Sequence, residues 1–207
     1  VTFDKGDAAY IEAGSSIMLQ VHYNTVFLPV ETPPTPDQTK VQFWTLPAGQ
    51  LPDRVIYRTG VTAGVNVPPN NNHVVSTATQ SMQQLASVGQ TGLFVPGEVI
   101  GMTPHAHQIA SAMTSDLTAG GQKTCLINVP KWDFNWQLDY LFPTGVKYAA
   151  TDSITATCVY DNSAQHQPVV DGVQQQPRTV TFGEGSLDEM CLHYVWLRMD
   201  RKAFAAE

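Results

Sequence analysis

Short stretches in which apolar and polar residues alternate limit the fold of this 207-residue chain more than any other feature. In residues 154–160, Ile154, Ala156, Cys158 and Tyr160 alternate with two threonines and a valine, which is the two-residue period of a β-strand. Similar patterns predict strands at residues 16–23, 41–46, 107–117, 122–129 and 190–197. Only residues 79–88 could form a helical turn or two. The sequence therefore predicts an all-β fold, an antiparallel β-sandwich of the jelly-roll type.

The segments between these strands are rich in turn residues. Fourteen prolines and fifteen glycines are spread along the chain, as expected for many short strands joined by turns. Residues 29–38 contain four prolines and are predicted to be a long loop. Ala119, Gly120 and Gly121 predict a hairpin between two strands, and the polar residues 161–178 predict a long exposed loop.

Composition excludes several classes of function. The formal charge of −7, without any cluster of Lys or Arg, disfavours nucleic acid as a partner. No apolar run approaches the roughly 18 residues that a membrane-spanning helix needs. The sequence starts at Val1 without a signal peptide, as a processed protein or an excised piece would. Three cysteines allow one disulfide, and in an exported protein we expect one pair plus one buried thiol, although spacing alone does not select the pair.

His105 and His107 form the most informative motif. On a strand, residues two apart point to the same face, so both imidazoles could bind one metal ion. Two imidazoles on the polar face of a surface strand would have the same spacing. Met190, next to Asp188 and Glu189, is either core filler or a third ligand. A thioether suits copper, especially Cu(I), better than zinc or magnesium, so this set points to redox chemistry rather than hydrolysis.

The other candidates have simpler interpretations. His73 and His166 are predicted to lie on the surface, and His193 to be a hydrogen-bonded histidine in or near the sandwich. His22 could be exposed or a ligand. Three aromatic residues in 132–137 predict a strand that buries large rings in the core. The chain contains neither Gly-x-Ser-x-Gly nor Cys-x-x-Cys, so nothing supports nucleophilic hydrolysis.

Five segments together resemble one known family. They are LQVHYN (19–24), PHAH (104–107), WDFNWQ (132–137), TCVYDNS (157–163) and GEGSLDEMC (183–191), and they fall in the family's order. The family is that of the copper type II, ascorbate-dependent monooxygenases, which includes the peptidylglycine hydroxylating enzymes and dopamine β-monooxygenase. WDFNWQ and the Tyr-Asp-Asn-Ser part of TCVYDNS look closest to its bacterial members.

The resemblance implies a two-domain enzyme. Two jelly-roll domains would face each other across a solvent-filled cleft, each with one copper, and hydroxylate a C–H bond of a small-molecule substrate using O₂ and ascorbate. The oxygen-activating copper would be held by His105, His107 and Met190, the catalytic set. The family's disulfide would be Cys158–Cys191, which leaves Cys125 unpaired. An enzyme of this kind is expected to be secreted or periplasmic.

The second, electron-storing copper is expected to be incomplete. His22 matches one of its three histidines, but the chain has no adjacent pair of histidines to supply the others. Residues 1–48 are therefore interpreted as the last strands of a first copper domain, and residues 49–207 as the second. We expect copper binding without efficient turnover by this chain alone. Two alternatives remain: a copper-binding or electron-transfer module without hydroxylase activity, and a structural jelly roll that binds no metal.

The substrate side departs from the peptidylglycine enzymes. Their arginine, asparagine and tyrosine that hold a peptide carboxylate correspond to Thr103, Leu192 and Tyr194, so only the tyrosine is retained. An amidating role on peptides is therefore not expected. Tyr194 could line the substrate side or be a structural residue of a sandwich strand.

Overall fold

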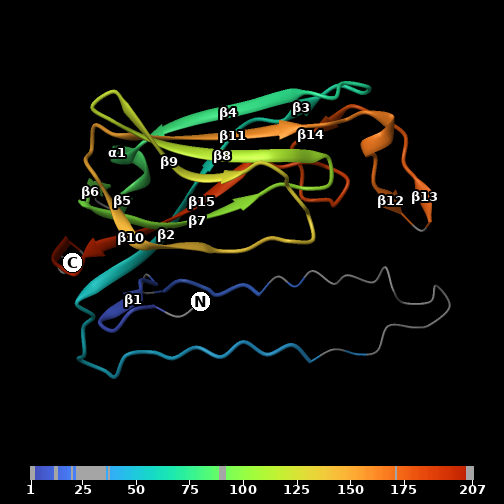
Figure 1. Ribbon diagram of the computed structural model, residues 1–207. Coiled ribbons are helices and arrows are strands. Elements are labelled where there is room, and N and C mark those ends of the chain that lie inside the picture. Colours follow the sequence, from blue (N-terminus) through green and yellow to red (C-terminus); the bar gives the residue numbers. More distant parts are fainter. Residues whose placement is uncertain are drawn as a thin grey trace.

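Two facing β-sheets form the body of the molecule (Figure 1). The structure, a computed structural model, describes residues 3–11, 14–19, 21, 36, 38–88, 92–170 and 172–203. Nearly all regular elements are strands, and all but one of the strand pairings within the two large sheets are antiparallel. The all-β sandwich predicted from the sequence is confirmed, whereas its jelly-roll type stays a prediction.

One sheet has five strands in the order β1-β2-β15-β7-β10. Their bounds are β1 Asp7–Ala9, β2 Arg54–Thr62, β15 Leu192–Asp200, β7 Gly97–His105 and β10 Tyr140–Tyr148. β15 is central and pairs with both β2 and β7. β1 runs parallel to β2 and extends the sheet at its edge.

The other sheet has four strands in the order β4-β11-β8-β9. Their bounds are β4 Val74–Ser81, β11 Ser153–Tyr160, β8 Ala110–Ala119 and β9 Gln122–Val129. The predicted strand 122–129 is confirmed at both ends, and 154–160 lies within β11. Gly120 and Gly121 join β8 to β9 with positive φ values of 55° and 81°, which confirms the hairpin.

The remaining elements are short. Three two-stranded ribbons pair β3 Asn66–Val67 with β14 Val180–Thr181, β5 Ser87–Val88 with β6 Leu93–Phe94, and β12 Val169–Val170 with β13 Val173–Gln174. Helical turns occur at α1 Met82–Leu85, η1 Ala164–His166 and η2 Arg201–Ala203. α1 lies within the predicted helical range 79–88, where Ser81 caps its first turn. The polar loop 161–178 contains η1, β12 and β13, and most of its side chains are exposed or half-buried.

The core lies between the two sheets, as strand alternation requires. In β11, Ile154, Ala156, Cys158 and Tyr160 are buried, and the residues between them are half-buried. Ile154 and Ala156 belong to one apolar cluster, and Cys158 and Tyr160 to a second one nearer β3 and β14. The second cluster includes Trp132 and Cys191, so it packs directly behind the His-x-His segment.

The strands predicted at residues 41–46 and 132–137 are wrong. Residues 41–46 form no strand, and their large side chains are exposed, including Trp44 at 84%. Residues 132–137 bend in a turn in which Asp133 accepts hydrogen bonds from the backbone N–H groups of Asn135 and Trp136. Trp132 is buried, but the turn leaves Trp136 67% exposed. In residues 16–23, the described positions are not in a strand, and Gln20, His22 and Tyr23 lie outside the described residues.

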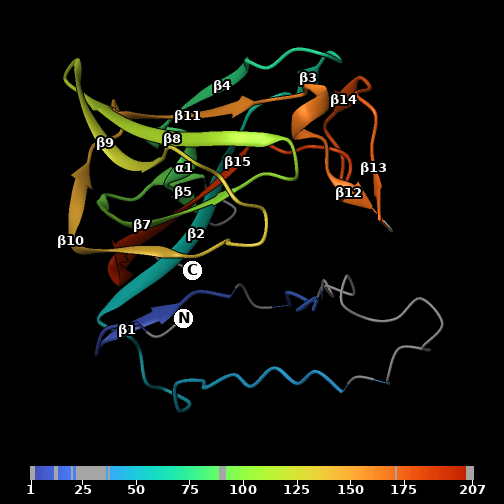
Figure 2. The ribbon, with the colours of Figure 1, turned by 45° about the vertical axis from the view of Figure 1, so that its right-hand side comes forward.

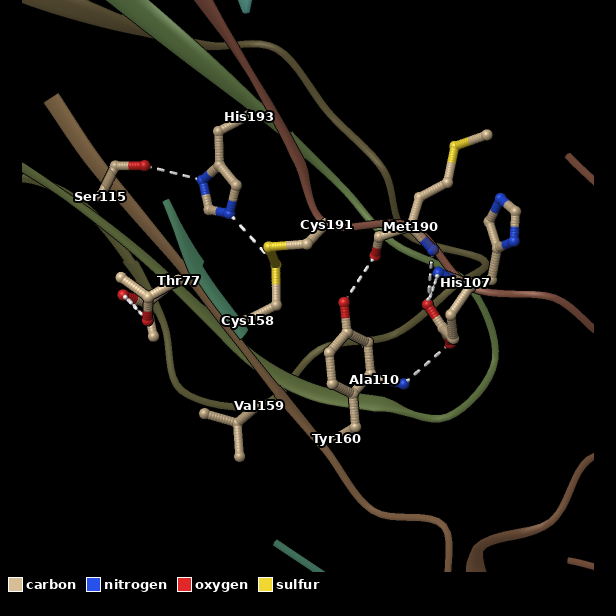
Figure 3. Close-up of a disulfide and its surroundings, with 12 residues drawn as sticks. Thr77, His107, Ala110, Ser115, Cys158, Val159, Tyr160, Met190, Cys191 and His193 are labelled. Atoms are coloured by element: carbon tan, nitrogen blue, oxygen red, sulfur yellow. Dashed lines mark hydrogen bonds between the residues drawn. A yellow bond between two sulfur atoms is a disulfide. The ribbon is translucent and has the colours of Figure 1, made fainter. Parts of the chain in front are cut away.

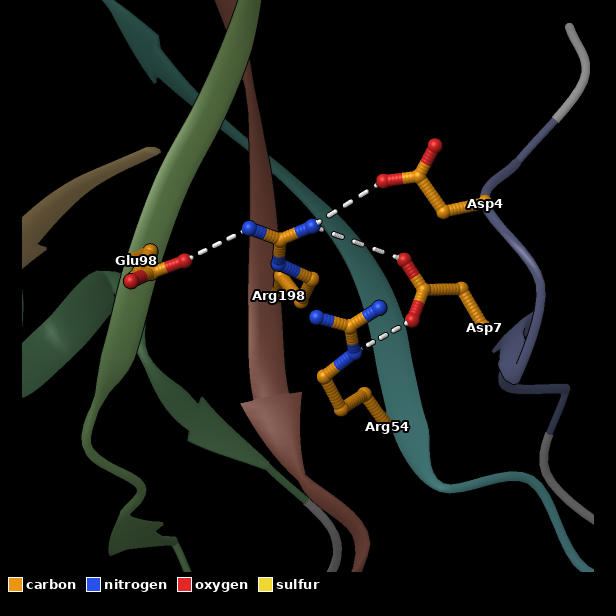
Figure 4. Close-up of polar contacts among 5 residues, drawn as sticks. All are labelled: Asp4, Asp7, Arg54, Glu98 and Arg198. Carbon is orange, nitrogen blue, oxygen red and sulfur yellow. Dashed lines mark hydrogen bonds and ion pairs between the residues drawn. The ribbon is translucent and has the colours of Figure 1, made fainter. Parts of the chain in front are cut away.

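A group of charges fastens residues 3–11 to one end of the five-stranded sheet (Figure 4). Arg198 pairs with Glu98 at 2.7 Å and with Asp4 at 3.3 Å, and Arg54 pairs with Asp7 at 2.6 Å. Residues 38–50 run beneath the sandwich in both ribbon views (Figure 1 and Figure 2). Among the described residues, no helix is long and apolar enough to cross a membrane.

Candidate metal centre

The His-x-His segment lies where β7 ends and β15 begins. His105 is the last residue of β7 and pairs with Leu192, the first residue of β15. The polypeptide leaves the strand at this point and His107 becomes buried, with 3% of its surface exposed. The rings of His105 and His107 are 5.2 Å apart between centroids and almost perpendicular, at 85°. The structure therefore brings these two predicted ligands together. The expectation that both lie on one strand is wrong, because β7 ends at His105 and β8 begins only at Ala110.

Hydrogen bonds set the tautomer of both imidazoles. The Nδ1 atom of His107 lies 3.1 Å from the Asp188 carbonyl oxygen, which can only accept, so Nδ1 carries the proton. The Nδ1 atom of His105 lies 2.6 Å from Oε1 of Gln137. The Gln137 amide nitrogen donates to the Phe134 carbonyl at 2.7 Å, which fixes Oε1 as the atom facing His105. In the neutral rings the lone pair is therefore on Nε2, the form that binds metals.

Glu189 connects this segment to Met190. Its carboxylate is fully buried and accepts hydrogen bonds from four backbone N–H groups, those of His107, Ile109, Ala110 and Met190, at 2.8–3.2 Å. Burial raises the pKa of Glu189 to about 7, whereas the four amide donors favour the charged form. Because His107 and Met190 donate to the same Oε2 atom, their backbones lie next to each other.

Two buried aromatic side chains hold the same backbone from the core side. The Tyr160 hydroxyl donates to the Met190 carbonyl oxygen at 2.9 Å (Figure 3), and the Trp132 indole N–H donates to the His107 carbonyl oxygen at 3.1 Å. Burial raises the pKa of Tyr160, so its hydroxyl stays protonated and can donate. The backbone on both sides of the candidate centre is thus fixed by side chains from β11 and from the loop after β9.

A disulfide lies next to the centre. Cys158 in β11 and Cys191 before β15 are bonded, with their Cα atoms 5.8 Å apart, which confirms the pairing implied by the family resemblance. Cys125 is free and exposed, because it lies on β9 at the edge of its sheet. The expectation that the third thiol is buried is therefore wrong. Cys158, Cys191 and His193 place three potential ligand atoms within 4.8 Å, but the sulfurs are joined and are not thiolates, so we do not assign a metal there.

A family model decides what kind of protein this is. The model of the copper type II ascorbate-dependent monooxygenase C-terminal domain matches residues 53–200. The chain belongs to this family. Comparison with curated proteins gave no match. Copper is the cofactor of the family, and the matched range contains His105, His107 and Met190 together with the disulfide.

The other described histidines of this monooxygenase domain are either exposed or hydrogen-bonded in the core. His73 and His166 are exposed, as predicted. His193 is fully buried, and its Nδ1 lies 2.7 Å from the Ser115 hydroxyl, which confirms a hydrogen-bonded core histidine (Figure 3). Burial lowers the pKa of His193 to about 4. His22, the predicted remnant of the second copper site, lies outside the described residues.

The predicted substrate-side positions of the monooxygenase domain lie on the outer face of the five-stranded sheet. Tyr194 is opposite Thr103 across the β15–β7 pair, and Leu192 is opposite His105. The Tyr194 ring contacts the guanidinium group of Arg58 at 3.6 Å. The structure therefore places Tyr194 on the same face of the sheet as His105, two residues further along β15 than Leu192, the partner of His105.

The residues that hold the centre in place were not predicted from the sequence. Glu189, Gln137 and Tyr160 act on ligand residues that are 30–82 positions away in the sequence. Of the three, only Glu189 gave a local signal in the sequence, because an acidic residue is rarely found next to a methionine in a protein core. The other two sit within segments of the family motif, where they had no assigned role.

Proposed function

We propose that His105, His107 and Met190 hold one copper ion, and that this is the oxygen-activating site of a monooxygenase that hydroxylates a C–H bond with O₂ and ascorbate. The observation that carries the proposal is the pair of tautomers. Both Nδ1 atoms face acceptor oxygens, so the lone pair of each neutral ring is on Nε2, and the two rings lie 5.2 Å apart between centroids.

The donor set fits copper. Two neutral imidazoles bind copper and zinc alike, but a thioether is a soft ligand that favours Cu(I). Glu189 holds the backbones of His107 and Met190 against each other, so that a thioether can complete the set. Met190 is half-buried, as a ligand at a solvent-facing site would be.

When bound, copper would supply the redox chemistry with O₂, and the residues of the chain would prepare the site. Gln137 and the Asp188 carbonyl hold the protons on Nδ1 and orient the rings. Tyr160 and Trp132 fix the carbonyl groups of Met190 and His107, so the backbone that would hold the copper is restrained on both sides.

Efficient turnover would need a second copper. His22 would be one ligand of that site, and the other ligands would come from the rest of the first copper domain, to which residues 1–48 would belong. In this proposal residues 49–207 form the oxygen-activating domain, and the enzyme works in a secreted or periplasmic setting, where the disulfide is stable.

The second candidate function is a copper-binding or electron-transfer module without hydroxylase activity. The absence of an adjacent His-His pair from the whole sequence favours it. Steady consumption of O₂ and ascorbate, with formation of a hydroxylated product, at ordinary enzyme rates by the copper-loaded 207-residue chain would exclude it and would show that no second site is needed.

Anaerobic titration with Cu(I) in competition with a chromophoric Cu(I) chelator tests metal binding. We expect one tightly bound Cu(I) per chain, and an affinity lowered by roughly 100-fold in His107→Ala. His73→Ala is the matched control, since His73 is exposed and far from the pair in sequence. Equal Cu(I) affinity of the His107→Ala variant and the parent would contradict the proposal.

A further inference from the structure

The outer face of the five-stranded sheet continues from the candidate copper site. In β15, Leu192, Tyr194 and Trp196 alternate with the core residues His193, Val195 and Leu197, so the first three lie on the outer face of the sheet. Trp196 is nevertheless buried on that face, with 9% of its surface exposed. His105 pairs with Leu192 and therefore lies on the same face. One step of two residues along a strand is about 7 Å, which is the spacing between the rows of His105 and Tyr194.

Arg58 on β2 reaches over this face. It pairs with Trp196, and its guanidinium carbon lies 3.6 Å from the centre of the Tyr194 ring and 5.2 Å from that of Trp196. The next residue of β2 on this face is Gly60, opposite Tyr194, which has no side chain to separate Arg58 from the ring. Stacking on aromatic rings holds a guanidinium flat and leaves its N–H edge available to an acceptor.

The aromatic support is itself fixed. The Trp196 indole N–H donates to the Thr103 hydroxyl at 2.9 Å, and the Thr103 hydroxyl donates to the Asp139 carboxylate. Trp196 also contacts the ring of Phe3, with 6.0 Å between centroids. The rings beneath Arg58 are therefore anchored by contacts on β7 and on the N-terminal segment.

Arg58 differs from its neighbours in charge pairing. Arg54 and Arg198, further along the same sheet, form ion pairs with Asp7, Asp4 and Glu98 (Figure 4). No carboxylate of the described residues forms an ion pair with Arg58, which is exposed. The carboxylate of Asp139, just before β10, already accepts a hydrogen bond from the Thr103 hydroxyl.

We propose that Arg58 is the specificity-determining residue that binds a carboxylate group of the substrate. A guanidinium edge pairs with a carboxylate through two parallel hydrogen bonds, which fixes direction as well as charge. A carboxylate held above Tyr194 would place a carbon roughly 7–10 Å away near the His105 row. The preferred substrates would then be small organic acids with a reactive C–H group at that distance. This assignment of a substrate class rests on the proposed function.

The test uses the metal-free full chain, so that its outcome does not depend on copper binding. Phenylacetate is titrated into isotope-labelled protein while the NMR signals of the Arg58 side chain and the Tyr194 ring are followed. Neutral phenylacetamide has the same shape without the charge, and inorganic phosphate tests for general anion binding. Arg58→Gln removes the guanidinium group, and Lys147→Gln is the matched control, since Lys147 is an exposed cation at the far end of the sheet.

We expect saturable shifts at Arg58 and Tyr194 with phenylacetate, at least tenfold weaker binding in Arg58→Gln, and unchanged binding in Lys147→Gln. Arg58→Lys is expected to fall between them, because lysine keeps the charge but loses the planar pair of donors. Equal binding of the amide, tighter binding of phosphate, unchanged binding in Arg58→Gln, or no binding at all would each overturn the proposal. A failed Cu(I) titration with intact carboxylate binding would instead overturn the proposed function alone.

Discussion

Glu189 is a buried carboxylate that accepts hydrogen bonds from four backbone N–H groups on both sides of the candidate copper site. A buried charge without such partners would be strongly unfavourable, so the hydrogen bonds offset the cost of its burial. Its role is to position the site: it holds the His107 segment beside Met190 without being a proposed ligand.

Replacing Glu189 by Gln should therefore destabilise the protein. The amide offers only one acceptor oxygen, and its NH₂ group would face backbone N–H donors that need an acceptor. We expect a loss of about 3 kcal/mol in the free energy of unfolding, measured by urea denaturation. Glu184→Gln is the control, because Glu184 is exposed, and it should change stability by less than about 0.5 kcal/mol. A loss of less than about 0.5 kcal/mol in the free energy of unfolding of Glu189→Gln would contradict this role.

His193 makes stability depend on pH. Its folded pKa of about 4 lies below the ordinary value of 6.5, because burial disfavours the charged ring. Between pH 6.5 and 4 the unfolded state binds the proton and the folded state does not, so stability falls as the pH is lowered through this range. The loss attributable to His193 should approach about 3 kcal/mol at pH 4.

His193→Gln keeps a polar partner for Ser115 and cannot titrate. Its unfolding free energy, measured by urea denaturation, should fall less than that of the parent between pH 6.5 and 4. Comparison of the two proteins removes the contribution of Glu189, whose raised pKa acts in the opposite direction between pH 4.5 and 7. Parallel pH profiles for the two proteins would show that His193 does not carry the effect.

At the level of elements, the disulfide fastens the two sheets to each other. Cys158 belongs to β11 of the four-stranded sheet, and Cys191 directly precedes β15 at the centre of the other sheet. The bond therefore closes a loop of 33 residues that contains the exposed segment 161–178 and the Glu189–Met190 segment. Closing such a loop restricts the unfolded chain and also anchors one candidate ligand beside the core.

Removal of this bond in Cys158→Ala/Cys191→Ala should lower the free energy of unfolding by about 3–4 kcal/mol. Chemical denaturation under identical conditions measures the difference. Cys125→Ser is the matched control, and its stability should equal that of the parent, since Cys125 is exposed and unpaired with another cysteine. A loss below about 1 kcal/mol in the double variant would mean that the sheets are held together without the bond.

The sequence predicted those elements whose structure depends on local pattern. The β8–β9 hairpin and β11 follow from alternation and from two glycines with positive φ. Residues 132–137 also alternate, but the Asp133 side chain caps a turn there, and this local hydrogen bond competes with a strand. Residues 41–46 have a strand pattern, yet no strand of the described part of the chain pairs with them.

The same reasoning explains what could be predicted of the site. His105, His107 and Met190 were recognisable from residue type, spacing and the family motif, and stand as proposed ligands. Glu189, Gln137 and Arg58 were not assigned roles, because their contacts depend on which distant segments the fold brings together. Arg58 carries no local signal of its own: an exposed arginine on a strand becomes distinctive only through the rings of Tyr194 and Trp196.

At the level of the whole molecule, the residues before β2 expose an unusual amount of apolar surface. Val41, Phe43, Trp44, Leu46 and Leu51 are each at least 44% exposed, and Met18 is 91% exposed. Exposed apolar groups that lie together usually mark a surface that another protein or domain covers. In the proposed function, this surface would be covered by the rest of the first copper domain.

The isolated chain should therefore self-associate as its concentration rises. Sedimentation analysis should show association that is weakened in Phe43→Ser/Trp44→Ser, because the largest exposed rings are removed. Leu93→Ser is the control, since Leu93 is 68% exposed but lies in a different part of the chain. Monomeric behaviour of the parent chain at all concentrations would contradict the prediction.

In the proposed site, His105, His107 and Met190 bind one copper ion together. X-ray absorption spectroscopy of the Cu(I)-loaded chain tests it most directly, because sulfur and nitrogen ligands scatter differently. We expect two nitrogen ligands and one sulfur ligand, with the sulfur lost in Met190→Leu and retained in Met18→Leu. A spectrum without sulfur, or a sulfur signal that persists in Met190→Leu, would contradict it.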